Sequence, residues 1–258
     1  MRVGSLFSGI GGLDEGLERA GMTTKWQCES DPFCQEILRR RFPHVKHLYP
    51  DATKLTSKIA RFQVDVLTGG FPCQPVSVAG DMWWEDDERW LWPVFLRVIQ
   101  WCEPNWVVIE NVEGIRTRGL DQILRSLADS GYDAEWDRLS AQAFGAPHQR
   151  QRYFIIAYPC GSFRGNMPCV YRKPSLTGKA FYENCHIRSR RLYGIGRKEV
   201  EKVRSPFGGF GWWRFEPDLD RMGYGIPDLV DRHRAIGNAV VPQVAEWLGR
   251  RIMEVENG

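Results

Sequence analysis

A cysteine held in a rigid turn carries the strongest chemical signal in this sequence. Residues 70–75 read GFPCQP and place Cys73 between two prolines. The apolar run Val64–Leu67 comes just before them and predicts a strand that ends at the turn. Prolines restrict the backbone on both sides of the thiol, and the carboxyl ends of strands in α/β proteins are where ligands bind. The pattern favours a nucleophilic thiolate, with a buried structural cysteine as the alternative.

A carboxyl group at the end of a second apolar strand is a candidate acid. Residues Trp106–Glu110 form an apolar run that ends in Glu110. Burial raises the pKa of a carboxyl group, which can then act as a general acid. A helix-capping or loop carboxylate is the alternative. The functional interpretation depends on Cys73, because the ends of two strands of one sheet would bring both groups to the same edge.

An arginine pair precedes a third apolar run. Arg150 and Arg152 lie directly before the predicted strand Tyr153–Ala157. Alternation along an extended segment would put both guanidinium groups on one side. There they could hold a phosphate and a carbonyl oxygen, although a surface pair of arginines is the alternative.

A glycine-rich turn near the start of the chain indicates a nucleotide-type cofactor. Residues 8–12 read SGIGG and lie between a predicted strand and a predicted helix. This is a partial dinucleotide fingerprint, since Asp14 stands where the third glycine would be. Glu29 ends the next predicted strand about 20 residues on, where an acid would bind ribose hydroxyls. These residues favour an adenosyl ligand, and they leave open whether it is a nicotinamide cofactor or S-adenosylmethionine.

Strand and helix patterns alternate through the first 157 residues and position these groups. The predicted strands are Val3–Phe7, Thr24–Glu29, Val64–Thr68, Trp106–Glu110, Asp133–Leu139 and Tyr153–Ala157. The predicted helices are Leu13–Ala20, Pro32–Phe42, Trp90–Trp101, Leu120–Ser130 and, near the end of the chain, Gln243–Met253. This alternation predicts an α/β fold with a doubly wound, mostly parallel sheet that helices cover on both faces.

Composition limits the class of protein. The chain has 258 residues, of which 43% are hydrophobic and 26% charged, which suits one sizeable domain with at most a small appendage. No run of about 18 apolar residues occurs, and no leader precedes the first strand, so we expect neither a membrane span nor a signal peptide. Seven scattered cysteines favour reduced thiols in a cytoplasmic protein. The spacing of Cys160, Cys169, Cys185 and His186 fits no paired zinc motif, so we expect no metal.

A basic, loop-rich segment interrupts the pattern. Residues 158–210 hold eleven Lys or Arg and three acids, a net charge of +8, whereas the rest of the chain carries −5. Such a segment on an acidic body indicates a polyanion partner, with a solvated basic surface as the alternative. We therefore expect a catalytic domain formed by residues 1–157 plus 213–258, and an inserted recognition region, 158–212. The predicted polyanion contacts are Arg188, Arg190, Arg191, Arg197 and Lys198.

The order of these motifs resembles that of the DNA (cytosine-5)-methyltransferases. The resemblance rests on FSGIGG, GFPCQP, the ENV of 110–112, the RQR of 150–152 and the RAIGNAVVP of 234–242. It covers residues 3–157 and about 211–253. The chain lacks the Asp/Asn/Ser-Pro-Pro-Tyr/Phe motif of adenine-N6 and cytosine-N4 methyltransferases.

The resemblance implies covalent catalysis on a cytosine that has left the stack of duplex DNA. Cys73 matches the nucleophile that attacks C6 of the base. Glu110 matches the acid that binds N3 and the 4-amino group. Arg152 matches an arginine that contacts the base, and Arg150 one near the nucleophile and the DNA backbone. The implied fold is the Rossmann-like fold of S-adenosylmethionine-dependent methyltransferases.

The resemblance also implies a site for S-adenosylmethionine. Phe7 matches an aromatic side chain that packs on adenine, and Gly9 and Gly11 match the loop glycines. Glu29 matches the acid that binds the ribose. Asp51 matches the acid that contacts adenine.

Three further features follow from the resemblance. Asn238 matches a late asparagine that helps to close the pocket. Residues 75–90 match a mobile loop that closes on the flipped base, with a packed loop as the alternative. His148 stands where a glutamine is common, which changes a loop contact rather than the chemistry.

Other functions remain open from the sequence alone. An RNA cytosine-5 methyltransferase would share the fold, but the chain lacks the Cys-Phe-Thr motif of the tRNA-specific branch. A nicotinamide oxidoreductase and a catalytically silent DNA-binding relative fit the residues less well. We expect a monomer that acts on double-stranded DNA in the cytoplasm of a bacterial or phage-infected cell, with a companion restriction enzyme as a possible partner.

Overall fold

A single seven-stranded sheet forms the centre of the computed structural model, which describes residues 1–72, 90–146, 148–162 and 235–257. The strands are β1 (Arg2–Leu6), β2 (Thr23–Cys28), β3 (His47–Tyr49), β4 (Val66–Gly69), β5 (Trp106–Asn111), β6 (Tyr132–Ser140) and β7 (Gln151–Pro159). The α-helices are α1 (Gly12–Arg19), α2 (Pro32–Arg41), α3 (Trp92–Cys102), α4 (Ile115–Arg118), α5 (Leu120–Asp129) and α9 (Pro242–Asn257). Short 3₁₀ helices are η1 (Ala52–Lys54), η2 (Ser57–Phe62) and η4 (Ala141–Phe144).

The strand order is β3-β2-β1-β4-β5-β7-β6. The first five strands of this order are parallel, and β7 runs antiparallel to both of its neighbours. This arrangement is a doubly wound sheet with its switch point between β1 and β4, where ligands bind in such folds. It confirms the predicted α/β fold with a mostly parallel sheet.

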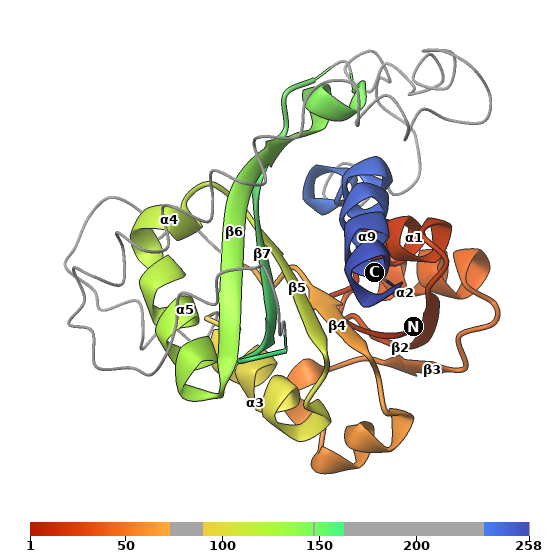
Figure 1. Cartoon of the computed structure of the whole chain (residues 1–258). Helices are drawn as coiled ribbons and strands as arrows, with labels where there is room; N and C mark the ends of the chain where they lie inside the picture. The colour runs from red at the N-terminus through yellow and green to blue at the C-terminus, as the bar shows by residue number, and fades with distance from the viewer. Residues whose placement is uncertain (73–89, 147, 163–234, 258) are drawn as a thin grey trace, which may run out of the picture.

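Helices cover both faces of this sheet. Figure 1 shows α1, α2 and α9 on one side and α3 and α5 on the other. Leu17 and Leu248 belong to the apolar core on the first side, whereas Phe95 and Ile123 belong to the core on the second. Strand β5 is buried along its whole length, which explains why Trp106–Ile109 are continuously apolar rather than alternating with polar residues.

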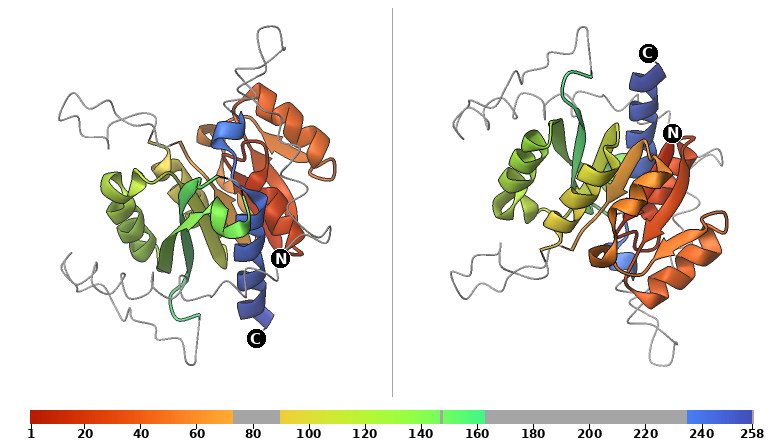
Figure 2. Two further views of the ribbon diagram at one scale, coloured as in Figure 1. Left: turned by 90° about the horizontal axis from the view of Figure 1, so that it is seen from above. Right: turned by 90° about the horizontal axis from the view of Figure 1, so that it is seen from below.

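Helix α9 joins the end of the chain to its beginning. Both views in Figure 2 show α9 beside the N-terminal elements. A Cβ at Gly16 of α1 would collide with the Pro242 carbonyl and the Ala245 side chain, so the two helices pack at close range. The Trp106 indole donates a hydrogen bond of 2.6 Å to Glu256 and ties α9 to β5. The predicted helix 243–253 is therefore present and extends four residues further.

Each of the other predicted strands and helices is also present, with ends displaced by at most two residues. Strand β7 begins at Gln151, before its apolar run, because Gln151 and Arg152 pair with Ser140 and Leu139 of β6. Arg152 is thus part of the strand and does not precede it. At its other end β7 continues through Tyr158 and Pro159, beyond the expected domain boundary, and most of the recognition region 158–212 lies outside the described residues.

Candidate active site

The turn that leads to Cys73 lies against the end of β5. In the parallel pair β4–β5, Gly69 is opposite Ile109, so the next residues, Gly70 and Glu110, meet just beyond β4. A Cβ added at Gly70 would lie 2.6 Å from Oε2 of Glu110, so this close approach requires glycine. The turn that leads to Cys73 thus contacts the end of β5 at Gly70 and Phe71, and the expected meeting of Cys73 with Glu110 stays a prediction. Cys73 itself lies outside the described residues.

Asn111 and Phe71 fix the turn in place. Nδ2 of Asn111 donates a hydrogen bond of 3.2 Å to the Phe71 carbonyl. The Phe71 ring is buried and packs against Trp90, Trp92 and Phe95 at centroid distances of 5.2–6.4 Å. Sequence reasoning had assigned no role to Asn111, although its place inside the ENV motif was the available signal.

Glu110 is a buried acid beside an arginine. Only 6% of Glu110 is exposed. Burial raises its pKa to about 7, although the positive charges of Arg152 and Arg150 act to lower it. Nε of Arg152 lies 3.0 Å from Oε1 of Glu110 as an ion pair, and among the described residues that oxygen accepts no hydrogen bond. A carboxyl group with this pKa can give and take a proton near neutral pH.

Arg150 connects this site to the late motif. It has a positive φ of 28°, and its Nη2 donates a hydrogen bond of 2.8 Å to the carbonyl of Gly237. Burial lowers the pKa of the guanidinium, and its Nε has no hydrogen-bond partner in the part of the chain that the structure describes. Gly237 therefore contacts the site through Arg150, and the exposed Asn238 follows it directly in the chain. The structure thus brings Glu110, Arg150 and Arg152 together, as the sequence predicted.

The glycine loop lies at the carboxyl end of β1. Phe7, Gly9 and Gly11 all have positive φ, between 52° and 82°. A Cβ at Gly9 would meet no atom of the described ranges within 4 Å, so these parts of the protein leave the backbone open there. A Cβ at Gly11 would collide with the ring of Phe42. The loop is therefore backed by protein at Gly11 and open to a ligand at Gly9.

Glu29 holds the loop to the start of α2. One carboxylate oxygen accepts a hydrogen bond of 2.7 Å from the Gly9 amide, and the other accepts one of 2.8 Å from the Asp31 amide. A carboxylate has about four acceptor positions, so both oxygens can also accept ribose hydroxyls.

Asp51 and Phe7 lie near the same end of the sheet. Asp51 caps η1 by accepting hydrogen bonds from Thr53, which lower its pKa. Burial raises the pKa of Cys28 to about 12, and the nearby charges of Glu29 and Asp51 add to that rise, so both acids lie close to the end of β2. The half-buried ring of Phe7 stacks on Phe95 at 6.3 Å. An adenosine group fits this set of an aromatic ring, two acids and an open glycine backbone.

Asp14 explains why the third glycine is absent. Its side chain is fully buried and accepts hydrogen bonds of 3.0 Å from the Ser5 hydroxyl and 2.9 Å from Nε2 of Gln27. Burial raises its pKa to about 6. Ser8 donates to the Ser5 hydroxyl at 2.9 Å, so the network reaches the glycine loop. Two polar residues inside apolar strands, Ser5 and Gln27, were the signal that sequence reasoning passed over.

Several predicted residues lie outside the described ranges. These are Cys73, Arg188, Arg190, Arg191, Arg197 and Lys198, together with Cys169, Cys185 and His186. Of the expected closing loop 75–90, the structure describes Trp90. Within the described ranges, no cluster of three potential metal-ligating side chains occurs. None of the helices in these ranges combines the length and apolar character that a membrane span requires.

Comparison with known proteins identifies the family. The model of the C-5 cytosine-specific DNA methylases matches residues 1–166, more than half of the chain. The Type II methyltransferase M2.BsuMI of Bacillus subtilis is 34% identical, with 98% of this chain and 76% of that protein covered. The chain belongs to the C-5 cytosine-specific DNA methylase family. Another member, the Type II methyltransferase M.AquIA of Picosynechococcus, is 33% identical over 61% of this chain and 71% of its own length.

Solved structures agree with this membership. A DNA modification methyltransferase encoded within an E. coli prophage is 28% identical with a TM-score of 0.56, over 69% of this chain. The Dnmt2 methyltransferase of S. pombe is 26% identical with a TM-score of 0.54, over 65% of this chain. The matches span 52% and 53% of those two chains, so this DNA methylase covers about half of their length.

Proposed function

We propose that this DNA methylase transfers a methyl group from S-adenosylmethionine to C5 of a cytosine flipped out of duplex DNA. The observation that carries the proposal is the meeting of Gly70, Glu110 and Arg152. The backbone of the cysteine turn packs on the carboxyl group of Glu110, and Arg152 lies 3.0 Å from that group. An acid and a cation beside the turn that leads to the proposed nucleophile support this chemistry, because attack on a cytosine ring requires all three groups.

Cys73 is the proposed nucleophile. C5 of cytosine is a poor nucleophile, and attack of the Cys73 thiolate on C6 makes C5 enamine-like. Glu110 in its protonated form donates to N3 and so neutralises the charge that the attack places on the ring. Arg152 holds the base through its carbonyl oxygen. After methylation, the C5 proton leaves to a base, the electron pair reforms the C5–C6 double bond, and the thiolate departs from C6.

The cofactor site is proposed at the glycine loop. S-adenosylmethionine supplies an electrophilic methyl group. Gly9 offers an open backbone and Glu29 carries acceptors for ribose hydroxyls, whereas Phe7 and Asp51 are proposed to contact the adenine. Asn238 lies on the segment that Arg150 holds and that packs on α1. That segment is proposed to close the pocket.

Double-stranded DNA is the proposed partner. Residues 158–212 carry a net charge of +8, against −5 on the rest of the chain, and Arg188, Arg190, Arg191, Arg197 and Lys198 are proposed to contact phosphates. A companion restriction enzyme, a monomeric state and a cytoplasmic location stay predictions. The relatives named Type II methyltransferases give the first of these a basis.

Transfer of tritiated methyl groups tests the function. Purified protein is incubated with labelled S-adenosylmethionine and either duplex DNA of mixed sequence or RNA. The expected result is label in DNA and none in RNA, lost in Glu110→Ala. Label in RNA would instead favour the RNA methyltransferase, and label in neither substrate by a folded protein would contradict the proposal.

A further inference from the structure

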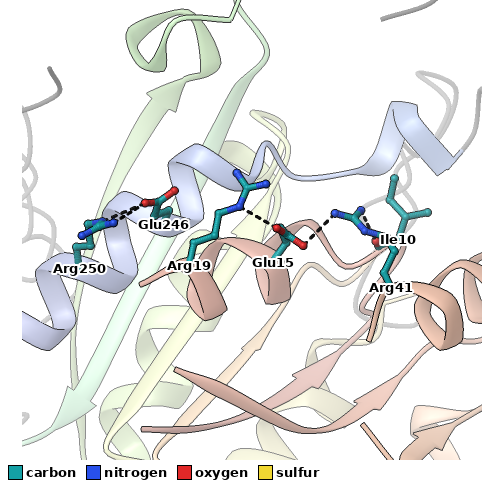
Figure 3. A network of polar contacts seen from close by, with 6 residues as sticks. All are labelled: Ile10, Glu15, Arg19, Arg41, Glu246 and Arg250. Carbon is teal, nitrogen blue, oxygen red and sulfur yellow. Dashed lines mark hydrogen bonds and ion pairs between the residues drawn. The ribbon is translucent and has the colours of Figure 1, made fainter. Parts of the chain in front are cut away.

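The last turn of α2 forms a hydrogen bond with the glycine loop through Arg41. Nη1 of Arg41 donates a hydrogen bond of 3.1 Å to the carbonyl of Ile10, a residue of the loop. Nη2 of Arg41 lies 3.2 Å from Oε2 of Glu15, which belongs to α1. Figure 3 shows Arg41 between Ile10 and Glu15. One guanidinium therefore joins α2, the loop and α1.

Glu15 is itself held from a second direction. Nε of Arg19 donates a hydrogen bond of 2.8 Å to Oε1 of Glu15. The carboxylate thus has one arginine on each oxygen, as the dashed lines in Figure 3 show. The planar guanidinium of Arg41 presents several donors in a fixed geometry, so it can serve the carbonyl and the carboxylate together.

The contact fixes one peptide plane at both ends. The Ile10 carbonyl and the Gly11 amide belong to the same planar peptide unit and point in opposite directions. The carbonyl accepts from Arg41, and the amide donates a hydrogen bond of 2.8 Å to the Ser8 carbonyl. Without Arg41, the plane would be held at one end only.

This hydrogen bond restrains a flexible part of the loop, because Ile10 lies between two glycines. Gly9 and Gly11 have positive φ values of 54° and 82°, and glycine has many other conformations available. Helix α1 has no side chain that caps its N-terminus at Gly11. Phe42 packs beneath Gly11, directly after Arg41 in the chain. The end of α2 therefore holds the loop through the packing of Phe42 on Gly11 and through the hydrogen bond from Arg41 to Ile10.

We propose that Arg41 is a positioning residue that holds the glycine loop in its cofactor-binding conformation, without touching the cofactor. The inference rests on the proposed function, in which S-adenosylmethionine binds at this loop. A loop that spends less time in the competent conformation binds its ligand more weakly by the same fraction. Arg41 is thus expected to set cofactor affinity and not the rate of methyl transfer.

Arg41→Met tests the proposal because it keeps the apolar stem and removes the donors. Arg40→Met is the matched control, since the neighbouring Arg40 pairs with Glu36 of its own helix. Hydrogen exchange of residues 7–12 in the cofactor-free protein should be faster in Arg41→Met than in Arg40→Met. Calorimetry should show S-adenosylmethionine affinity reduced about 3- to 10-fold in Arg41→Met, with Arg40→Met within about twofold of wild type.

Two further readouts separate positioning from general damage. At saturating cofactor, kcat of Arg41→Met should match wild type while KM for the cofactor rises, and Arg41→Lys should recover part of the affinity. Equal exchange and equal affinity in the Arg41 and Arg40 variants would overturn the proposal, as would a loss of kcat without a change of KM. If wild type fails to bind S-adenosylmethionine, the proposed function fails, whereas the exchange experiment still decides whether Arg41 holds the loop.

Discussion

Gly70 and Glu110 lie at the ends of neighbouring parallel strands, so close that a Cβ at Gly70 would stand 2.6 Å from Oε2 of Glu110. The backbone that leads to Cys73 thus packs directly against the acid. A side chain at residue 70 would therefore require the carboxyl group to move from this position.

Gly70→Ala is expected to displace the Glu110 carboxyl group and to lower kcat about 10- to 100-fold, because small displacements of catalytic groups are costly. Cofactor affinity should change much less, since the added Cβ is directed at Glu110 and not at the glycine loop. Steady-state kinetics at saturating cofactor measure the effect. Gly114→Ala is the control: a Cβ there meets nothing within 4 Å, and its φ is −58°. Equal activity of the two variants would refute the proposed role of the close contact.

Glu110→Gln is expected to change how stability depends on pH. Burial raises the pKa of Glu110 from 4.5 to about 7, so the folded state binds this proton more tightly than the unfolded state. The resulting stabilisation is fully present below pH 4.5 and is lost as pH rises through about 7. When the pH rises from about 5.5 to about 8.5, the free energy of unfolding of wild type should therefore fall by about 1–3 kcal/mol relative to that of Glu110→Gln.

Urea unfolding of both proteins at the two pH values measures this difference. Glu113→Gln is a suitable control, because Glu113 forms an exposed ion pair with Arg138. A difference between wild type and Glu110→Gln that does not vary with pH would show that Glu110 is ionised in the folded protein.

Glu29→Ala is expected to weaken S-adenosylmethionine binding by about 1–3 kcal/mol, roughly 5- to 150-fold. The side chain holds the Gly9 amide and offers acceptors to ribose hydroxyls, so its loss affects both the loop and the ligand. DNA affinity should change much less. Calorimetry on this variant and on Glu36→Ala, an exposed residue of α2, distinguishes the site from a general charge effect. Wild-type affinity in Glu29→Ala would remove Glu29 from the cofactor site.

Particular residues show how far the sequence could predict this structure. Apolar runs predicted the strands β4 and β5, and the glycine and prolines of the turn indicated where β4 ends. The meeting of the cysteine turn with Glu110 was expected from these two strands. The three-residue strand β3 was missed, because so short a segment has no measurable period. Arg152 was placed before β7, since an apolar pattern cannot show that polar residues pair with β6.

Long-range contacts account for most of the rest. Arg150 meets Gly237 across 87 residues, and Arg41 meets Ile10 across 31. No local pattern encodes such contacts, because they arise only when α9 packs on α1 and α2 packs beside the loop. In the sequence, Asp14 was interpreted only as a departure from the glycine fingerprint. In the structure, it accepts hydrogen bonds from Ser5 and Gln27 and so helps to support the loop.

Neutralising Arg190 and Arg191 together is expected to flatten the slope of log affinity for DNA against log salt by up to about 2 units. Phosphate contacts determine salt dependence, whereas contacts with base edges determine sequence choice, so the preferred sequence should change much less. Fluorescence anisotropy on duplex DNA across a salt series measures both. Slopes that coincide for wild type and the double variant would place the DNA contact on another part of the protein.

Bisulfite sequencing of DNA from a host without its own cytosine methylation tests the central claim most directly. Cells express either wild type or Cys73→Ser, whose hydroxyl is far less ionised than a thiol near neutral pH. The account predicts protected cytosines within one short sequence in cells with wild type and none in cells with Cys73→Ser, although both proteins are folded and bind DNA. Protection that persists in Cys73→Ser, or its absence with folded wild type, would contradict the account.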